Sequence, residues 1–188
     1  MGMTDCQPFS RSDAICNQNG HREQINALSS YIDGSNIYGS DISVSEGLRT
    51  KDGGELRVHE LGPTMPTRKD AGFESGHGEN PQKLVAGDMR AIETPGLASL
   101  HSLFLNEHNR ISRVLKEKSP DLVDEELYQI TRKIVGAELQ NIVYSEFLPV
   151  VLGEEAMLKF NLKLTEYESG KSVYDLVILS FPTTSSLN

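Results

Sequence analysis

The sequence predicts a mainly α-helical fold made of two long helices and long irregular loops. Residues 95–118 and residues 124–147 each carry apolar side chains every three or four positions, which is the period of an α-helix. Residues 50–83 instead concentrate glycine, proline and charge, a composition typical of loops. With 188 residues, of which 37% are hydrophobic, the chain is long enough to bury a core.

The chain before residue 84 predicts little regular structure. Residues 1–23 are polar and irregular, and residues 25–40 combine helix-compatible side chains with an Asp-Gly turn signal. Residues 50–83 predict a long surface excursion with a short strand at residues 56–58. The two long helices therefore dominate the predicted fold.

The first long helix has clear signals at both ends. Thr94 can cap the first backbone N–H groups, and Pro95 occupies the first helical position, where its missing N–H costs nothing. The Ser119-Pro120 pair predicts the end of the helix. One apolar stripe runs along it and consists of Leu97, Leu100, Phe104, His108, Ile111 and Leu115.

The second long helix begins with acidic residues at 124–126, where carboxylates interact favourably with the helix dipole. It runs to about Phe147, and Pro149 and Gly153 predict its end. Its apolar residues cover a wide arc and are Leu127, Ile130, Ile134, Leu139, Ile142 and Val143. Such a broad apolar surface is typical of a helix that lies inside a larger protein.

Composition excludes several classes of partner. The formal net charge is −9 and the isoelectric point is about 5.0, with no cluster of basic residues, which argues against nucleic acid. The apolar run at residues 176–179 is far shorter than the roughly 20 residues of a spanning helix. The first residues lack the order of basic, apolar and small residues that marks a signal peptide. We expect no nucleic-acid partner, no membrane span and no signal peptide in this chain.

Two cysteines, Cys6 and Cys16, lie close together in the sequence. Their spacing is unsuited to a metal site but compatible with a small disulfide loop. The residues themselves leave open whether the two cysteines pair.

Oxygen-bearing side chains recur at alternate positions near residue 32, namely at Ser29, Tyr31, Asp33 and Ser35. In an extended segment, alternate residues can turn their oxygens toward one point. Hydroxyls, a backbone carbonyl and a carboxylate are hard donors of the kind that Ca²⁺ collects. One carboxylate is little charge for a cation site, however, and a plain Asp-Gly turn explains the same residues. Taken alone, the segment therefore favours a turn over a calcium site.

Two histidines lie on the first long helix. His101 and His108 are two helical turns apart, whereas one metal ion needs helical ligands three or four residues apart. His108 also belongs to the apolar stripe. We therefore predict that both are core histidines.

The loop before that helix carries Arg90 and Glu93, three residues apart. As an exposed ion pair they would contribute only about 0–1 kcal/mol to stability. The alternative is a loop placed against a ligand that needs both charges.

Three stretches of the chain together closely resemble the animal haem peroxidase family. They are "REQINALSSYIDGSNIYGS" (22–40), "LVAGDMRAIETPGLASLHSLFLNEHNRIS" (84–112) and "DEELYQITRKIVGAELQNIVYSEFLPVVLG" (124–153). The resemblance covers about residues 5–155, and residues 156–188 form a divergent tail. It implies that residues 1–188 are part of an animal haem peroxidase domain and that the protein is extracellular.

The resemblance also assigns roles to residues. Arg90 matches the arginine that stabilises negative charge while the peroxide O–O bond breaks, and Glu93 matches the carboxylate that forms an ester to a haem methyl carbon. Thr94 stands where a member of the family has a methionine linked to haem, so that link is not expected. The implied cofactors are covalently attached haem b and Ca²⁺. The residues that fall on the family's calcium ligands are Ser29, Tyr31, Asp33 and Ser35.

The resemblance further implies that parts of the haem site lie outside this chain. The family's distal histidine and a second ester-forming aspartate would precede Asp5, as would the cysteine that bonds the residue matching Cys6. The proximal histidine would follow Gly153, but the chain has no histidine after His108. We therefore expect an internal piece of a peroxidase that is inactive by itself. It lacks the histidine that ligates iron and the histidine that deprotonates the peroxide.

The leading hypothesis is a segment of a haem-dependent peroxidase, in which hydrogen peroxide oxidises a small-molecule or protein donor and the remainder of the domain is the partner. The alternative is a non-catalytic helical scaffold, derived from a peroxidase, that binds a partner through exposed helix faces. A calcium-binding module is a third, weaker reading.

Overall fold

A computed structural model describes residues 11, 14–16, 20–25, 28–73 and 80–164. The chain divides into two units, Met1–Tyr31 and Ile32–Asn188. In the first unit, strands β1 (Ala14–Cys16) and β2 (Arg22–Gln24) pair antiparallel. The prediction of irregular structure for residues 1–23 is wrong at these strands, because three residues are too few to show an alternating pattern.

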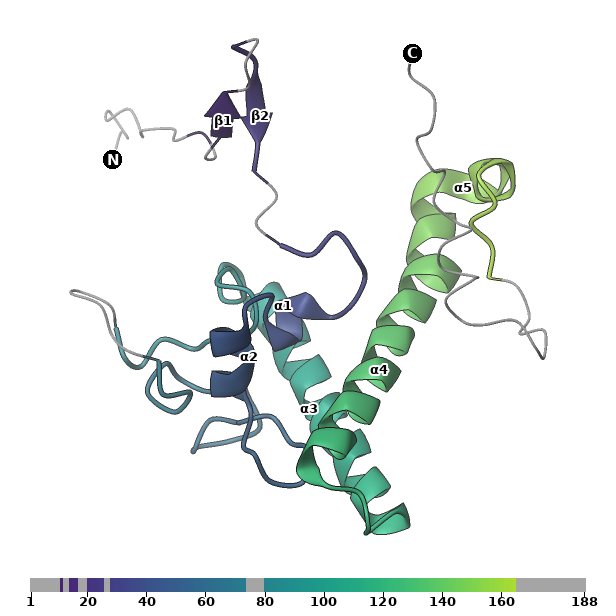
Figure 1. The fold of residues 1–188 in the computed structure, drawn as a ribbon. Coiled ribbons are helices and arrows are strands. Elements are labelled where there is room, and N and C mark those ends of the chain that lie inside the picture. The colour runs from purple at the N-terminus through teal and green to yellow at the C-terminus, as the bar shows by residue number, and fades with distance from the viewer. Residues whose placement is uncertain (1–10, 12–13, 17–19, 26–27, 74–79, 165–188) are drawn as a thin grey trace, which may run out of the picture. The chain divides into compact units, whose positions relative to one another are not determined.

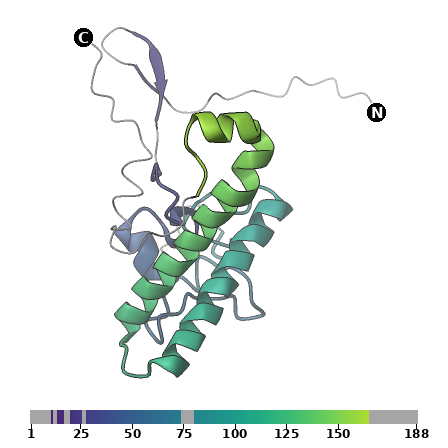
Figure 2. The ribbon, with the colours of Figure 1, turned by 90° about the vertical axis from the view of Figure 1, so that its right-hand side faces the viewer.

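The second unit is helical, as predicted (Figure 1). Its elements are α1 (Ser35–Tyr38), α2 (Ile42–Leu48), α3 (Pro95–Lys118), α4 (Asp124–Ile142), the π-helix η1 (Val143–Phe147) and α5 (Leu148–Lys159). Figure 2 shows α3 and α4 side by side as an antiparallel pair, with α4 running on through η1 into α5. Among the described helices, none is long and apolar enough to cross a membrane.

Both predicted ends of α3 are confirmed. The Thr94 hydroxyl oxygen accepts a hydrogen bond from the backbone N–H of Leu97 at 3.3 Å, and Pro95 is the first helical residue. The helix ends at Lys118, with Ser119 as its C-cap.

Of the two residues predicted to end the second long helix, Gly153 is confirmed and Pro149 is wrong. Pro149 does not stop it, and helical structure continues to Lys159. Pro149 has no N–H for the usual bond to the fourth residue back, and the wider π turn of η1 lies directly before α5. The real break is at Gly153, whose φ of 79° and ψ of 161° are not helical. A helix can thus pass a proline by widening one turn.

The strand predicted at residues 56–58 is also wrong, since only an isolated bridge joins Leu56 to Arg49. Side chains of α3 hold this loop instead. The Asn109 side chain accepts from the N–H of Leu56 at 2.7 Å and donates to its carbonyl at 2.9 Å. The Ser112 hydroxyl donates to the carbonyl of Gly53 at 2.5 Å. The loop therefore satisfies its backbone with a helix, not with a sheet.

The buried face of α3 overlaps the predicted apolar stripe, since His108 and Ile111 are buried and Phe104 and Leu115 are partly buried against the core. Leu100 is exposed, whereas the helix buries His101, Leu105, His108, Asn109, Ile111 and Ser112. Polar residues lie on this face because the loops packed against it present backbone groups that need partners. Apolar periodicity alone underestimates such a face.

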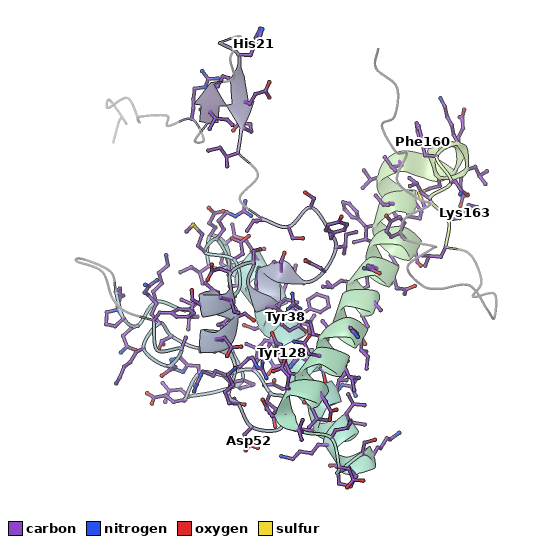
Figure 3. The ribbon with its side chains drawn as sticks, in the orientation of Figure 1. His21, Tyr38, Asp52, Tyr128, Phe160 and Lys163 are labelled. Carbon is purple, nitrogen blue, oxygen red and sulfur yellow. The ribbon has the colours of Figure 1, made fainter. Side chains whose placement is uncertain are left out.

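His108 lies at the centre of the core. Its Nε2 is 2.8 Å from the carbonyl oxygen of Gly54, and its Nδ1 is 2.9 Å from the Tyr38 hydroxyl. A carbonyl oxygen only accepts, so Nε2 carries the proton and the Tyr38 hydroxyl donates to Nδ1. Tyr128 packs edge-on to Tyr38 with ring centroids 6.0 Å apart, and the two lie close together in Figure 3. One neutral histidine thus joins α1, α3 and a loop.

A buried cation fixes the start of α4. Arg49 is 3% exposed, and its guanidinium donates to Asp124 at 2.8 Å and to Glu125 at 2.6 Å. The same guanidinium stacks 4.0 Å above the ring of Tyr128. Carboxylates near a helix N-terminus are favoured by the dipole, and here they also balance a desolvated charge.

Beyond this core, α4, η1 and α5 expose large apolar side chains, as the wide apolar arc of the second helix predicted. The exposed residues are Ile130, Ile134, Ile142, Phe147, Val150, Val151, Leu152 and Leu158. Exposed apolar surface of this extent is typical of a face that another part of a protein covers.

Burial of His108 predicts a stability that depends on pH. Burial lowers the pKa of His108 from its usual 6.5 to about 4, so the unfolded chain takes up the proton first as the pH falls. The contribution of His108 to the free energy of unfolding is therefore complete above about pH 6.5. It falls by about 1.4 kcal/mol per pH unit toward about pH 4, which amounts to about 3 kcal/mol in total.

Urea unfolding of the parent chain and of His108→Gln between those pH values checks this expectation. Carboxylate titration is common to both proteins, so the difference between their slopes reports His108. Equal losses of stability in the two proteins would contradict the assignment of His108 as a buried neutral base.

Candidate functional site

The loop that carries Arg90 rests on the backbone of α1. The N–H of Gly87 donates to the carbonyl of Ile37 at 3.1 Å, and the N–H of Asp88 donates to that of Asn36 at 3.0 Å. A further backbone bond of 2.9 Å joins Val85 to Pro66. The loop then leads directly into α3 at Pro95. Its polar residues are therefore placed by main-chain contacts.

Gly87 allows this close approach. A Cβ atom at Gly87 would lie 2.2 Å from the backbone nitrogen of Gly39 and 2.4 Å from the carbonyl oxygen of Ser35. Real Cβ atoms do not come this close to backbone atoms, so a glycine is required where the loop crosses α1.

Asp88 and Arg90 form a tight pair inside the loop. The Asp88 carboxylate accepts from Arg90 Nε at 3.0 Å, from Nη2 at 2.6 Å and from its backbone N–H at 2.8 Å. These bonds from Arg90 hold the pKa of the Asp88 carboxyl below its usual range. The same partner raises the pKa of Arg90. The pair is therefore ionised at neutral pH.

Arg90 is held at one edge and open at the other. Its side chain is 56% exposed, whereas that of Asp88 is 9% exposed. Glu93 is exposed one turn further on, and its N–H donates to the carbonyl of Arg90 at 2.9 Å. Met89 and Ile92 are exposed beside them. The loop thus exposes a cation, a carboxylate and two apolar side chains on one short stretch, and a functional role for Arg90 and Glu93 stays a prediction.

The prediction that His101 and His108 are core residues is confirmed. Both ring nitrogens of His108 bond protein groups, as described above, and His101 is 5% exposed with Nδ1 2.9 Å from the carbonyl oxygen of Leu97. His108 thus has both ring nitrogens bonded, whereas Nε2 of His101 is buried without a hydrogen-bond partner among the described residues. In the part of the chain that the structure describes, no three His, Cys, Asp or Glu residues cluster to hold a metal ion.

The four candidate calcium ligands fall in both units of the chain. In the first unit, the N–H of Tyr31 donates to the Ser29 hydroxyl oxygen at 3.2 Å. In the second, the N–H of Ser35 donates to the Asp33 carboxylate at 3.0 Å, and Gly34 has a φ of 71°. The second pair forms the turn that begins α1. Calcium binding by the four stays a prediction.

Sequence reasoning missed Asp88 and Gly87 as parts of the site. The signal was present, since a small residue and an acid directly precede the arginine at positions 87–90. A contact between residues two apart in a loop has no periodicity to reveal it. Cys6 lies outside the described residues, so the question of its pairing with Cys16 stays open.

A family model described as animal haem peroxidase matches residues 1–185. Mouse myeloperoxidase is 40% identical over 177 residues, which are 88% of this chain and 24% of that protein. Human eosinophil peroxidase is 40% identical over 162 residues, with 80% and 23% covered. A peroxidasin homolog of Caenorhabditis briggsae is 38% identical over 183 residues, with 87% and 14% covered. The chain thus spans no more than 24% of the length of these relatives.

Solved structures show the same relationship. Peroxidase A from Dictyostelium discoideum superposes with a TM-score of 0.55 at 31% identity, covering 72% of this chain and 28% of that one. A fatty acid alpha-dioxygenase of Arabidopsis thaliana gives a TM-score of 0.53 at 27% identity, covering 68% and 18%.

The close approach at Gly87 yields a prediction. We expect Gly87→Ala to lower the free energy of unfolding by about 1–3 kcal/mol, because the new methyl group forces backbone apart at α1. Gly96→Ala is the matched control, since a Cβ there meets nothing within 4 Å and the residue lies in α3. Thermal unfolding followed by circular dichroism measures both. Equal stability of the two variants would show that the loop does not rest on α1.

Proposed function

Because this chain belongs to the animal haem peroxidase family, we propose that it supplies part of the haem site of an enzyme that oxidises a donor with hydrogen peroxide. The family implies haem as the cofactor. The activity, the donor and the partners of the whole protein are proposals, since the chain spans no more than 24% of the length of these relatives. Because Arg90 and its neighbours are exposed, the donor that is oxidised can be either a small molecule or a protein.

The observation that carries this proposal is the exposed guanidinium of Arg90. It stays charged at any physiological pH and presents a rigid fork of donors. Asp88 occupies Nε and Nη2, and within the described residues Nη1 forms no hydrogen bond. Donors fixed before a reaction stabilise charge as it develops, without having to reorganise. We assign to Arg90 the stabilisation of negative charge on the peroxide oxygen that leaves.

The surface around Arg90 fits the edge of a haem. Met89 and Ile92 are exposed and apolar, as the contact with a porphyrin requires, and Glu93 places a carboxylate beside them. When bound, haem supplies the iron at which hydrogen peroxide is reduced. We propose that Glu93 holds haem b through an ester to a methyl carbon, a role that rests on the family resemblance.

The histidines of this site come, in our proposal, from other parts of a longer domain. His108 uses both ring nitrogens in the core, and His101 is buried with Nδ1 bound to a helix carbonyl. To reach iron or peroxide, His108 would have to break these bonds and His101 would have to leave the core. The same proposal makes residues 1–188 a partial domain with a tail at 156–188, and makes the protein extracellular.

Calcium is the second proposed cofactor. Its support is the resemblance of Ser29, Tyr31, Asp33 and Ser35 to the family's ligands, together with their hard oxygen donors. The Asp33 carboxylate already caps the turn before α1, so a bound cation would also strengthen that turn.

The rival function is the non-catalytic scaffold, which the exposed apolar faces of α4 and α5 would serve. Haem titration separates the two. We expect the isolated 188-residue chain to turn over guaiacol no faster than free haem does, because the family's distal and proximal histidines have no counterpart at the matching positions of this sequence. In a full-length protein that contains the chain, we expect a haem absorption band and turnover well above free haem. A full-length protein that binds no haem would favour the scaffold.

Arg90 and Glu93 should fail differently in such a full-length, haem-loaded protein. Arg90→Ala removes a donor that acts while charge develops, so peroxide activation should slow by about 10²–10³-fold. Glu93→Gln removes only a covalent tether. Part of the haem should then become extractable by acidified organic solvent, with a smaller loss of activity.

Stopped-flow measurement of the first reaction with peroxide and the fraction of extracted haem check both variants. Arg110→Ala is the matched control, because Arg110 is an exposed arginine paired to Glu107 on α3, outside the loop. If Arg90→Ala reacts at the parental rate, or Glu93→Gln leaves haem attachment unchanged, the assigned roles are wrong.

Calcium affinity of the isolated chain should be weak, since the segment offers a single carboxylate and affinity follows ligand charge and rigidity. Isothermal titration calorimetry should give a dissociation constant well above micromolar that weakens further in Asp33→Ala. Sub-micromolar affinity that survives this substitution would contradict the ligand assignment.

A further inference from the structure

We propose that Asp88 is a positioning residue that fixes the direction of the Arg90 guanidinium and leaves one of its nitrogens for the reacting oxygen. The inference rests on the role proposed for Arg90, and it adds a residue that acts through Arg90 and not on the substrate. It also explains why a buried carboxylate stands two residues before an exposed cation.

The geometry of the pair is that of a clamp. Asp88 Oδ1 accepts from both the backbone N–H and the Nε of Arg90, and Oδ2 accepts from Nη2. Two side-chain bonds from one edge of a planar fork set the plane as well as the position of the guanidinium. The third bond ties the carboxylate to the backbone of the residue that it orients.

Arg90 is the hydrogen-bond partner of the Asp88 carboxylate, and His101 is close enough to lower the pKa of that carboxyl further. Within the described ranges, the hydrogen bonds to the Asp88 side chain all come from Arg90. The side chain is 9% exposed, so water does not screen the pair on the Asp88 side, whereas the 56% exposed Arg90 can meet a ligand. An exposed ion pair would have two exposed partners. The buried carboxylate can therefore orient the guanidinium, while the exposed guanidinium contacts the ligand.

The backbone of the residues that orient Arg90 is itself bonded to α1. The N–H of Asp88 donates to the carbonyl of Asn36, and Gly87 touches the backbone of α1. The position of Arg90 is therefore traced through Asp88 to α1, and through Tyr38 and His108 to α3. A lysine at position 90 could not reproduce this arrangement, because an ammonium has no planar fork.

A first experiment needs no variant. Nitrogen-15 NMR of the 188-residue chain resolves the Nε–H groups of arginines and measures their exchange with water. We expect the Arg90 Nε–H to exchange at least tenfold more slowly than that of Arg110, whose carboxylate partner Glu107 is 28% exposed against 9% for Asp88. An Arg90 Nε–H that exchanges as fast as that of Arg110 would overturn the clamp.

A second experiment tests the catalytic meaning of the clamp by a double-mutant cycle in the full-length, haem-loaded protein. Asp88→Asn keeps the shape but turns a donor toward the guanidinium, so peroxide activation should slow by about 10–100-fold, as loss of orienting partners does at metal sites. If Asp88 acts only through Arg90, the variant with both Asp88→Asn and Arg90→Ala is no slower than Arg90→Ala alone. Glu107→Gln, which frees Arg110 in the same way, should leave the rate unchanged.

Two different results would count against the inference. Multiplicative losses in the double variant would mean that Asp88 acts independently of Arg90, and would overturn the positioning role. Arg90→Ala at the parental rate would overturn the proposed function, and with it the catalytic part of the inference. In that second case the Arg90 Nε–H of the unsubstituted chain would still exchange slowly. The NMR experiment therefore distinguishes failure of the proposed function from failure of the contact between Asp88 and Arg90.

Discussion

The second unit of this chain depends on one buried hydrogen-bonded histidine. His108 accepts from the Tyr38 hydroxyl and donates to the Gly54 carbonyl, and these bonds join α1 and the loop before α3 to the middle of α3. The ring is fully buried, so leaving either bond unmade would cost about 1–3 kcal/mol. Specific polar contacts, together with the burial of Ile37 and Tyr38 in the core, therefore hold the short α1 in place.

The position of α1 in turn fixes the position of the loop that carries Arg90. The loop at residues 84–93 has no regular structure, yet Gly87 and Asp88 bond to the backbone of α1 and give it a fixed base. Asp88 transfers that fixed position to the guanidinium of Arg90. A charged group intended for a transition state must be in place before the reaction, because moving it later would cost part of the stabilisation that it provides.

The sequence was informative where a pattern is local. Both ends of α3 followed from Thr94, Pro95 and the Ser-Pro pair, since capping depends on adjacent residues. It was misleading where contacts between distant residues determine the structure. Pro149 does not end its helix, because a π turn accommodates it. Residues 56–58 form no strand, because side chains of α3 bond to this loop. Leu100 was expected in the core and lies outside it, because hydropathy does not reveal which backbone groups a helix must satisfy.

For the site, sequence reasoning selected Arg90 and Glu93 by charge, and the family resemblance supplied their roles. Asp88 and Gly87 were missed, because their importance lies in a buried contact and a close backbone approach that no spacing rule encodes. The chain belongs to a family in which the reported relatives are at least about four times as long. The large exposed apolar face of α4 and α5 agrees with that difference in length.

The rigidity of the loop beneath Arg90 is the central claim, and amide hydrogen exchange of the 188-residue chain tests it most directly. The N–H groups of Gly87 and Asp88 donate to α1, so they should exchange nearly as slowly as the amides in the middle of α3. Exchange of these two amides at the rate of an unprotected loop, while α3 stays protected, would show that Arg90 is not held in place and would contradict the account.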